Sequence, residues 1–238
     1  MRTSQTSIFV EADNADVLRA LLANIDTDVP PRSEGRTTEQ TERYAIAHLL
    51  ATLPASRFTF PLTVVHGDRP DFLIEEGNGR RIAIEHVEAV PENEAKKAFL
   101  REVGDSEDMH FIAHAEPGER RRSTKKLLKE IDVDDASDGW VGDSVEREWA
   151  NAVAHFAAEK ARSVKKDGYD RGDETWLLMY DNWPLPHVKP EAAASYFVAH
   201  TAVADIFGSF SRVFVMDGQG VWEFTAGLWK YHALKRPN

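Results

Sequence analysis

The feature that most constrains how this chain folds is a block of three short β-type segments in its first half. The segments Phe58–Val65, Asp71–Glu76 and Arg80–Val87 are rich in β-branched and aromatic residues, a composition typical of strands. The last two are joined by Gly-Asn-Gly at positions 77–79, where glycine supplies the backbone freedom of a tight turn. The block therefore predicts an antiparallel hairpin preceded by a third strand.

Helical patterns surround this block, and their order predicts the fold class. A capping-box pattern at Thr37 and Gln40 opens a helix over 38–53, and Pro54 lies just past its end. The other expected elements are helices at 15–25, 91–103, 123–131, 144–166 and 190–207, a short apolar segment at 109–113, a buried strand at 175–181, and a closing hairpin of strands 212–216 and 221–224. This order predicts an α/β fold around a central mixed β-sheet flanked by helices.

The composition is that of one elaborated domain. The 238 residues are 42% hydrophobic and include six Trp, enough to bury a core. We expect an N-terminal extension over 1–36, a single domain over 37–238, and an insertion over 88–142 within that domain. The chain has no cysteine, no apolar run of membrane-spanning length and no signal-peptide core, so we expect a cytoplasmic protein without a membrane partner.

The charge balance bears on nucleic-acid binding. With 29 basic and 40 acidic residues, the net charge is −11, which argues against tight nonspecific binding to phosphate backbones. Segment 119–129 departs from this balance, because it holds six basic residues and one acidic residue. It either lines a local basic groove or is a solvated helix face.

The hairpin carries two carboxylates that we expect to face each other. With the turn centred on Asn78, Asp71 and Glu85 are equally far from it and oppose each other, with Cβ atoms roughly 4.5–5.5 Å apart. Two like charges beside an apolar strand are destabilising unless something neutralises them. A divalent cation would do so, because Mg²⁺ accepts one or two carboxylates and completes its shell with water and phosphate oxygens. The alternative is that Asp71 opens a strand after Pro70 while Glu85 pairs with an arginine.

These residues resemble a family. Pro70-Asp71, thirteen intervening residues and then Glu85 in an apolar strand resemble the PD-(D/E)XK nuclease superfamily. The preceding helix, the three strands, the following helix and the fourth strand also match its core, over residues 38–181 without 88–142. The resemblance implies a restriction-endonuclease-like core and Mg²⁺- or Mn²⁺-dependent hydrolysis of phosphodiester bonds, with DNA as the substrate. It also allows a homodimer.

The sequence departs from the family pattern at one position. Val87 stands where the pattern has lysine, and His86 points to the opposite face of the strand. Some family members supply the lysine from the following helix, and Lys160 lies on the apolar stripe of helix 144–166, which reads Trp149, Val153, Phe156, Lys160, Val164. The resemblance implies that Lys160 positions the attacking water and stabilises charge on the phosphate. The alternative is a lysine that snorkels from the edge of the stripe.

A second acid, Glu42, shares the inward face of helix 38–53 with Ile46, Leu49 and Leu53. In some members of the superfamily a glutamate of this helix helps to hold the metal, so the resemblance implies that Glu42 completes the site. The alternative is an ordinary glutamate at the edge of the surface.

Two other interpretations of the chain stay open. In the first, a nuclease fold has lost catalysis and serves as a nucleic-acid or protein binding module, which Val87 and the net charge of −11 favour. In the second, the protein recognises a partner through the apolar hairpin at 213–224. A lysine within reach of both carboxylates favours an active enzyme over the binding module.

Two further patterns have simpler explanations. His110 and His114 have the i, i+4 spacing of a zinc site on a helix, but no acid lies between them in a metalloprotease pattern, so we expect two loop histidines. Trp176, Trp183 and Trp222 could be platforms on which bases stack, although tryptophans at strand and loop positions are more often core residues.

Overall fold

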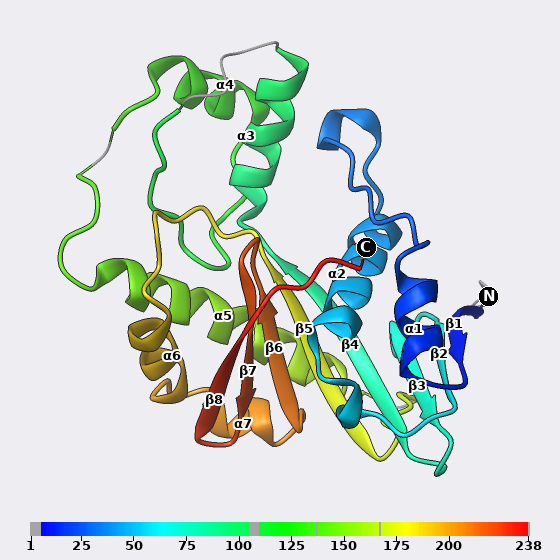
Figure 1. Ribbon diagram of the computed structural model, residues 1–238. Coiled ribbons are helices and arrows are strands. Elements are labelled where there is room, and N and C mark those ends of the chain that lie inside the picture. The colour runs from blue at the N-terminus through cyan, green and yellow to red at the C-terminus, as the bar shows by residue number, and fades with distance from the viewer. Residues whose placement is uncertain (1–5, 105–109, 137, 167, 238) are drawn as a thin grey trace.

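A single eight-stranded sheet organises the protein (Figure 1). The computed structural model describes residues 6–104, 110–136, 138–166 and 168–237. The strands are β1 Ser7–Ala12, β2 Leu62–His66, β3 Phe72–Glu76, β4 Arg81–Ala89, β5 Glu174–Asp181, β6 Arg212–Met216, β7 Gly220–Thr225 and β8 Leu228–Ala233. They lie in the sheet in chain order. Strands β4, β5 and β6 are parallel, whereas the other neighbours are antiparallel, so the predicted α/β class with a mixed sheet is confirmed.

Helices cover both faces of this sheet. The α-helices in the described residues are α1 Ala15–Leu22, α2 Thr38–Thr52, α3 Glu92–Val103, α4 Thr124–Val133, α5 Ser144–Ser163, α6 Pro190–Val198 and α7 Val203–Phe207. Residues of α2 share one core cluster with the sheet, and residues of α5 and α6 share another. Helices α3 and α4 stand out beyond the end of the sheet (Figure 1). None of the helices in the described ranges has the length and apolar composition of a membrane span.

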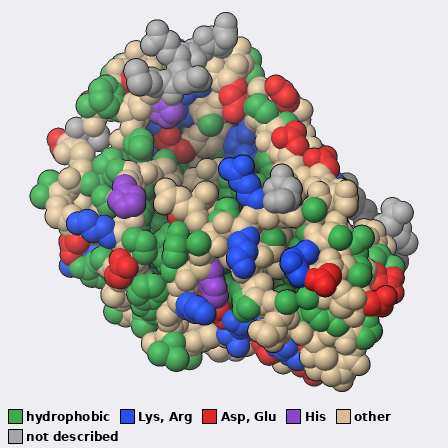
Figure 2. Space-filling view, viewed as in Figure 1, with side chains coloured by type: hydrophobic (Ala, Val, Ile, Leu, Met, Phe, Trp, Pro, Cys, Tyr) green, Lys and Arg blue, Asp and Glu red, His purple; other side chains and the backbone are tan. Residues whose placement is uncertain are grey.

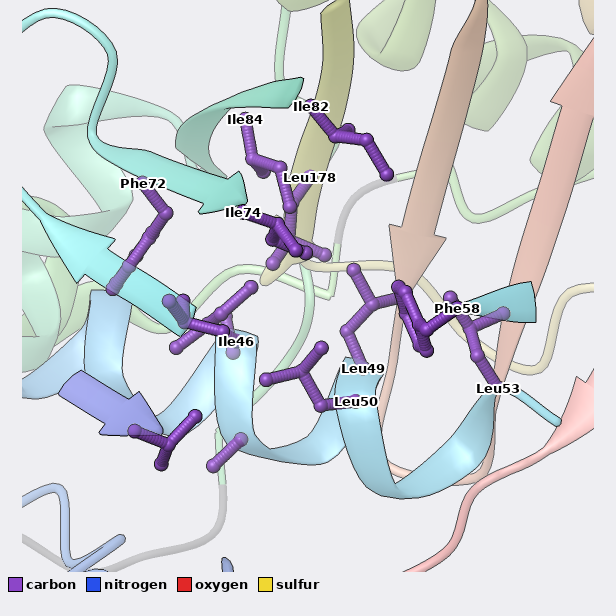
Figure 3. Close-up of a cluster of buried hydrophobic side chains, with 14 of the residues drawn as sticks. Ile46, Leu49, Leu50, Leu53, Phe58, Phe72, Ile74, Ile82, Ile84 and Leu178 are labelled. Carbon is purple, nitrogen blue, oxygen red and sulfur yellow. The ribbon is translucent and has the colours of Figure 1, made fainter. Parts of the chain in front are cut away.

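The core on the α2 face follows from alternation along the strands. Every second side chain of a strand points to the same face, and on this face the buried side chains interlock with the apolar stripe of α2 (Figure 3). The cluster includes Ile46, Leu49, Ile74, Ile84 and Leu178. Burying each such side chain contributes about 1.5–3 kcal/mol. The same alternation turns Glu85 toward the opposite face, which α5 covers.

Charged side chains of both signs lie on the face seen in Figure 1. Figure 2 shows Lys and Arg side chains across the middle of the face seen in Figure 1, with acidic side chains around them and a hollow beneath the part formed by α3 and α4. Residues of α3 and α4 line a cavity of about 460 Å³.

Local signals predicted most elements and missed those that depend on distant contacts. The capping box at Thr37 and Gln40 is formed as predicted. The predicted helix 190–207 is instead two helices, because the chain turns at 199–202, where His200 Nδ1 accepts a hydrogen bond from the N–H of Ala202. Strand β2 begins at Leu62 rather than at residue 58, after a 3₁₀ turn at 55–57.

The remaining differences concern the ends of the chain and the insertion. The sequence did not predict the two edge strands β1 and β8, and α5 ends at Ser163 rather than at residue 166. Of the short apolar segment 109–113, residue 109 lies outside the described residues and 110–113 have no regular structure.

Candidate functional site

The hairpin of β3 and β4 sets the geometry of the site. Phe72 pairs with Ile84 and Glu75 pairs with Arg81, which is the register predicted from the turn. Asp71 lies one residue before β3, so it is the next residue along this register and faces Glu85. Both side chains are largely buried, with exposed fractions of 16% and 7%. The structure therefore brings the two predicted carboxylates together.

Lys160 of α5 lies against both carboxylates. Its Nζ donates to Glu85 Oε2 at 2.7 Å and to Asp71 Oδ2 at 3.4 Å. The position follows from the helix stripe, because Trp149 and Val153 on the same side of α5 are buried in the core beneath it. A side chain that snorkelled into solvent would not make these contacts. The lysine is 75 residues from Glu85 and 89 from Asp71 in the sequence, so only the fold joins them.

Burial and mutual charge shift the protonation equilibria of Asp71 and Lys160 in this cluster. Burial raises the pKa of Asp71 to about 6, with Lys160 lowering it and Glu85 raising it further. The N–H of His86 donates to Asp71 Oδ2 at 2.7 Å and so favours the charged form. Burial lowers the pKa of Lys160, but attraction to Asp71 and Glu85 outweighs this effect and leaves the pKa above its ordinary value. With both acids ionised, one ammonium faces two carboxylates, and one negative charge is left over.

Asp71, Glu85 and Lys160 form a triad, and a cavity of about 190 Å³ opens beside it. Besides the triad, its lining residues are Asp68, Arg69, Ser163, Lys166 and Tyr169. The hydroxyl of Tyr169 is buried beside the carboxylate of Glu85. Burial, the charge of Glu85 and a hydrogen bond to Glu85 raise the pKa of Tyr169, so the phenol keeps its proton. Tyr169 lies in the loop after α5, and no sequence pattern distinguished it.

Glu42 lies nearby but has another partner. Its Oε2 is 2.9 Å from His66 Nε2, and this hydrogen bond raises the pKa of His66. Glu42 lines a second cavity, of about 580 Å³, together with Asp71 and Lys160. Within the described residues, no three His, Cys, Asp or Glu side chains are arranged to hold one metal ion. The structure thus places Glu42 beside the triad without joining it to the carboxylate pair.

The donor set that remains fits a hard divalent cation with a mostly non-protein shell. Asp71 and Glu85 offer carboxylate oxygens, and the excess negative charge between them is what a cation would relieve. Mg²⁺ commonly takes one or two carboxylates and fills its other positions with water and phosphate oxygens. The adjoining cavity gives those ligands room.

The other features singled out in the sequence have structural roles. His114 is hydrogen-bonded through Nδ1 to Glu148 and through Nε2 to the carbonyl of Gly139, each at 2.8 Å, so both ring nitrogens are occupied. In the basic segment 119–129, Arg121 pairs with Glu92, and Arg122 pairs with Glu119 and Glu130. Two of its six basic side chains are therefore neutralised locally.

The three tryptophans differ in their surroundings. Trp176 is fully buried in the core on the α2 face. Trp183 and Trp222 line a separate cavity near the carboxyl ends of β5 and β6.

Comparison with known proteins identifies no relative: no family model, no curated protein and no solved structure matches this chain. Functional inference therefore rests on the geometry of the candidate site.

Proposed function

We propose that the protein is a metal-dependent nuclease with a restriction-endonuclease-like core formed by α2, β2–β5 and α5. Asp71 and Glu85 would hold Mg²⁺ or Mn²⁺, and Lys160 would supply the ammonium that the family pattern places after the second acid. The observation that carries the proposal is the convergence of Lys160 Nζ on both carboxylates, at 2.7 and 3.4 Å, from a separate helix. DNA is the proposed substrate.

The chemistry that a bound metal ion supplies is a lowered pKa for a bound water and compensation of charge on the scissile phosphate. In the reaction, the oxygen of a water molecule bonds to phosphorus and its proton passes to solvent. The ester P–O bond breaks, and the sugar oxygen leaves with a proton from solvent. The positively charged Lys160 orients the attacking water and stabilises charge on the phosphate while it stays bonded to Glu85. Arg69 and Lys166, which line the same cavity, offset the charge of neighbouring phosphates.

The test is cleavage of plasmid and single-stranded DNA in the presence of EDTA, Mg²⁺ or Mn²⁺. We expect metal-dependent cleavage that is lost in Glu85→Gln and in Lys160→Met. Lys165→Met is the matched control, because Lys165 is exposed and does not line the cavity beside the triad. Cleavage that survives Glu85→Gln would contradict the proposal.

A second candidate, which Val87 and the net charge of −11 favour, is a nuclease fold that binds nucleic acid or protein without cutting. In this case the ion pairs of Lys160 with Asp71 and Glu85 are structural and replace a metal ion. Calorimetry separates the two functions. An enzyme binds Mg²⁺ in a manner that depends on Asp71 and Glu85, whereas the binding module shows no such heat and cuts no substrate.

A further inference from the structure

A third cavity, of about 220 Å³, lies near the carboxyl ends of the parallel strands β5 and β6. Its lining includes four aromatic side chains: Trp149 from α5, Trp183 from the loop after β5, Trp222 from β7 and Tyr231 from β8. The rings of Trp149 and Trp222 have centroids 5.3 Å apart, and those of Trp222 and Tyr231 are 5.1 Å apart. In α/β folds, the carboxyl ends of parallel strands are a common place for ligands.

The polar groups of this cavity have unused hydrogen-bonding capacity. Asp181 accepts one bond at each oxygen, from Trp149 Nε1 at 2.6 Å and from the N–H of Trp183 at 3.1 Å. Each carboxylate oxygen can accept a second bond. The other charge acting on Asp181 is that of a second carboxylate, Asp217, which also lines the cavity. Trp222 is only 2% exposed, and its Nε1 has no partner among the described residues.

These features restrict the chemistry of a ligand. Trp183 and Tyr231, the less buried of the four aromatic side chains, suit a flat ring that stacks. The carboxylates need N–H donors, and the Trp222 N–H needs an acceptor. A quaternary ammonium ion would meet the aromatic faces and the negative charge, but it offers no acceptor to Trp222. Adenine, cytosine and guanine offer a flat ring, an amino donor and a ring nitrogen or carbonyl acceptor together.

We propose that this cavity binds a single unpaired nucleobase that carries an exocyclic amino group. The proposal rests on the proposed nuclease function, since it assigns a base-binding site to the same nucleic-acid substrate. The cavity would contact the base, whereas the triad would contact only the phosphate.

The two sites lie on the same face of the sheet. Glu85 pairs with Leu177 across β4 and β5, and Asp181 lies four residues further along β5 on the side of Leu177. At about 3.3 Å per residue, the separation along the strand is roughly 13 Å. A short stretch of one nucleic-acid strand can span this distance. A base held in the aromatic cavity would therefore set which phosphate reaches Asp71 and Glu85.

The experiment is fluorescence anisotropy in EDTA, which prevents cleavage, with a labelled DNA duplex containing one unpaired cytosine. The comparison duplexes carry an unpaired thymine or an abasic site at that position. We expect the cytosine duplex to bind about tenfold more tightly than the abasic duplex, the effect of stacking one base. Trp222→Phe, which keeps a ring but removes the N–H, and Asp181→Asn should each lose this preference without weakening binding of the abasic duplex.

Controls separate this proposal from the proposed function. Glu85→Gln should keep the preference for cytosine, and so should Trp140→Phe, which removes an indole N–H outside the cavity. Equal affinity for the cytosine and abasic duplexes would overturn the base site, and so would failure to bind any of the duplexes. Quenching of tryptophan fluorescence by tetramethylammonium with no effect of an unpaired base would assign the cavity to organic cations instead. A retained base preference with no metal-dependent cleavage would overturn only the nuclease.

Discussion

Replacing Asp71 by asparagine should stabilise the folded protein at neutral pH. The pKa of Asp71 is raised from 3.8 to about 6, chiefly by burial. For an acid with a raised pKa, the folded state holds its proton over a pH range in which the unfolded state has lost it. The free energy of unfolding therefore falls as the pH rises from about 4 through 6. The difference in pKa corresponds to about 3 kcal/mol at and above neutral pH.

Asparagine resembles the protonated carboxyl group, and its side-chain oxygen can still accept the hydrogen bond from the N–H of His86. We therefore expect Asp71→Asn to exceed the wild type by up to about 3 kcal/mol near pH 7.5 and to equal it near pH 4. In a chain of this length, 1 kcal/mol shifts Tm by roughly 2–4 °C. The raised pKa of Asp181 has the same sign, but it cancels because both proteins contain Asp181.

The assay is urea unfolding followed by tryptophan fluorescence at several pH values, without divalent cations. Asp16→Asn is the control, because Asp16 is exposed on α1 and should show no comparable gain in stability. Two results would refute the reasoning: Asp71→Asn is less stable than the wild type near neutral pH, or the difference in free energy of unfolding does not shrink on acidification. Either would mean that ionisation of the Asp71 carboxyl does not destabilise the folded state. A cation at this site would then have no excess negative charge to relieve.

Three further predictions concern the same region. Lys160→Met should lower the free energy of unfolding by about 3 kcal/mol or more near neutral pH, because it leaves two buried carboxylates without their ammonium. Mg²⁺ should recover part of this loss in urea unfolding, and an equal stabilisation of Asp71→Asn by Mg²⁺ would point to binding elsewhere. Glu42→Gln should lower the pKa of His66 toward its ordinary value, as followed by NMR titration of the imidazole, and an unchanged titration would mean that the pair does not form in solution. The affinity for Mg²⁺ measured by calorimetry should be about tenfold weaker one pH unit below the pKa of Asp71 than at a pH where this carboxyl is fully ionised, because only about a tenth of it is then ionised. An affinity that does not change with pH would exclude Asp71 as a ligand.

The parts of the site that the sequence could predict are those set by local periodicity. Once the turn at 77–79 is located, the two-residue period of a strand determines that Asp71 faces Glu85. The helical period likewise determines that Lys160 points with Trp149 toward the core. What these periods leave open is which element lies opposite, and the contact of Lys160 with both carboxylates depends on the packing of α5 over β4.

The parts that the sequence missed depend on partners far along the chain. Strand β1 has one neighbour in the sheet, β2, which lies about fifty residues later in the chain. Its alternation of apolar and polar residues is also weak, because the apolar Ile8 is 65% exposed. The inward direction of Glu42 could be read from α2, but His66, at the end of β2, takes its carboxylate. Tyr169 lies in a loop, where no period constrains a side chain, so its place beside Glu85 is visible only in three dimensions.

The net charge of −11 describes the whole chain, whereas binding of nucleic acid depends on where the unpaired positive side chains lie. In the basic segment 119–129, Arg121 and Arg122 pair with glutamates, whereas the other four basic residues form no ion pair among the described residues. Arg69 and Lys166 form no ion pair among the described residues, and both line the cavity beside Asp71 and Glu85. Because each neutralised phosphate adds to affinity and to its salt dependence, these two cations predict salt-sensitive binding of phosphates beside Asp71 and Glu85. The acidic surplus therefore limits how many phosphates the protein contacts, and it leaves cations where the proposed hydrolysis requires them.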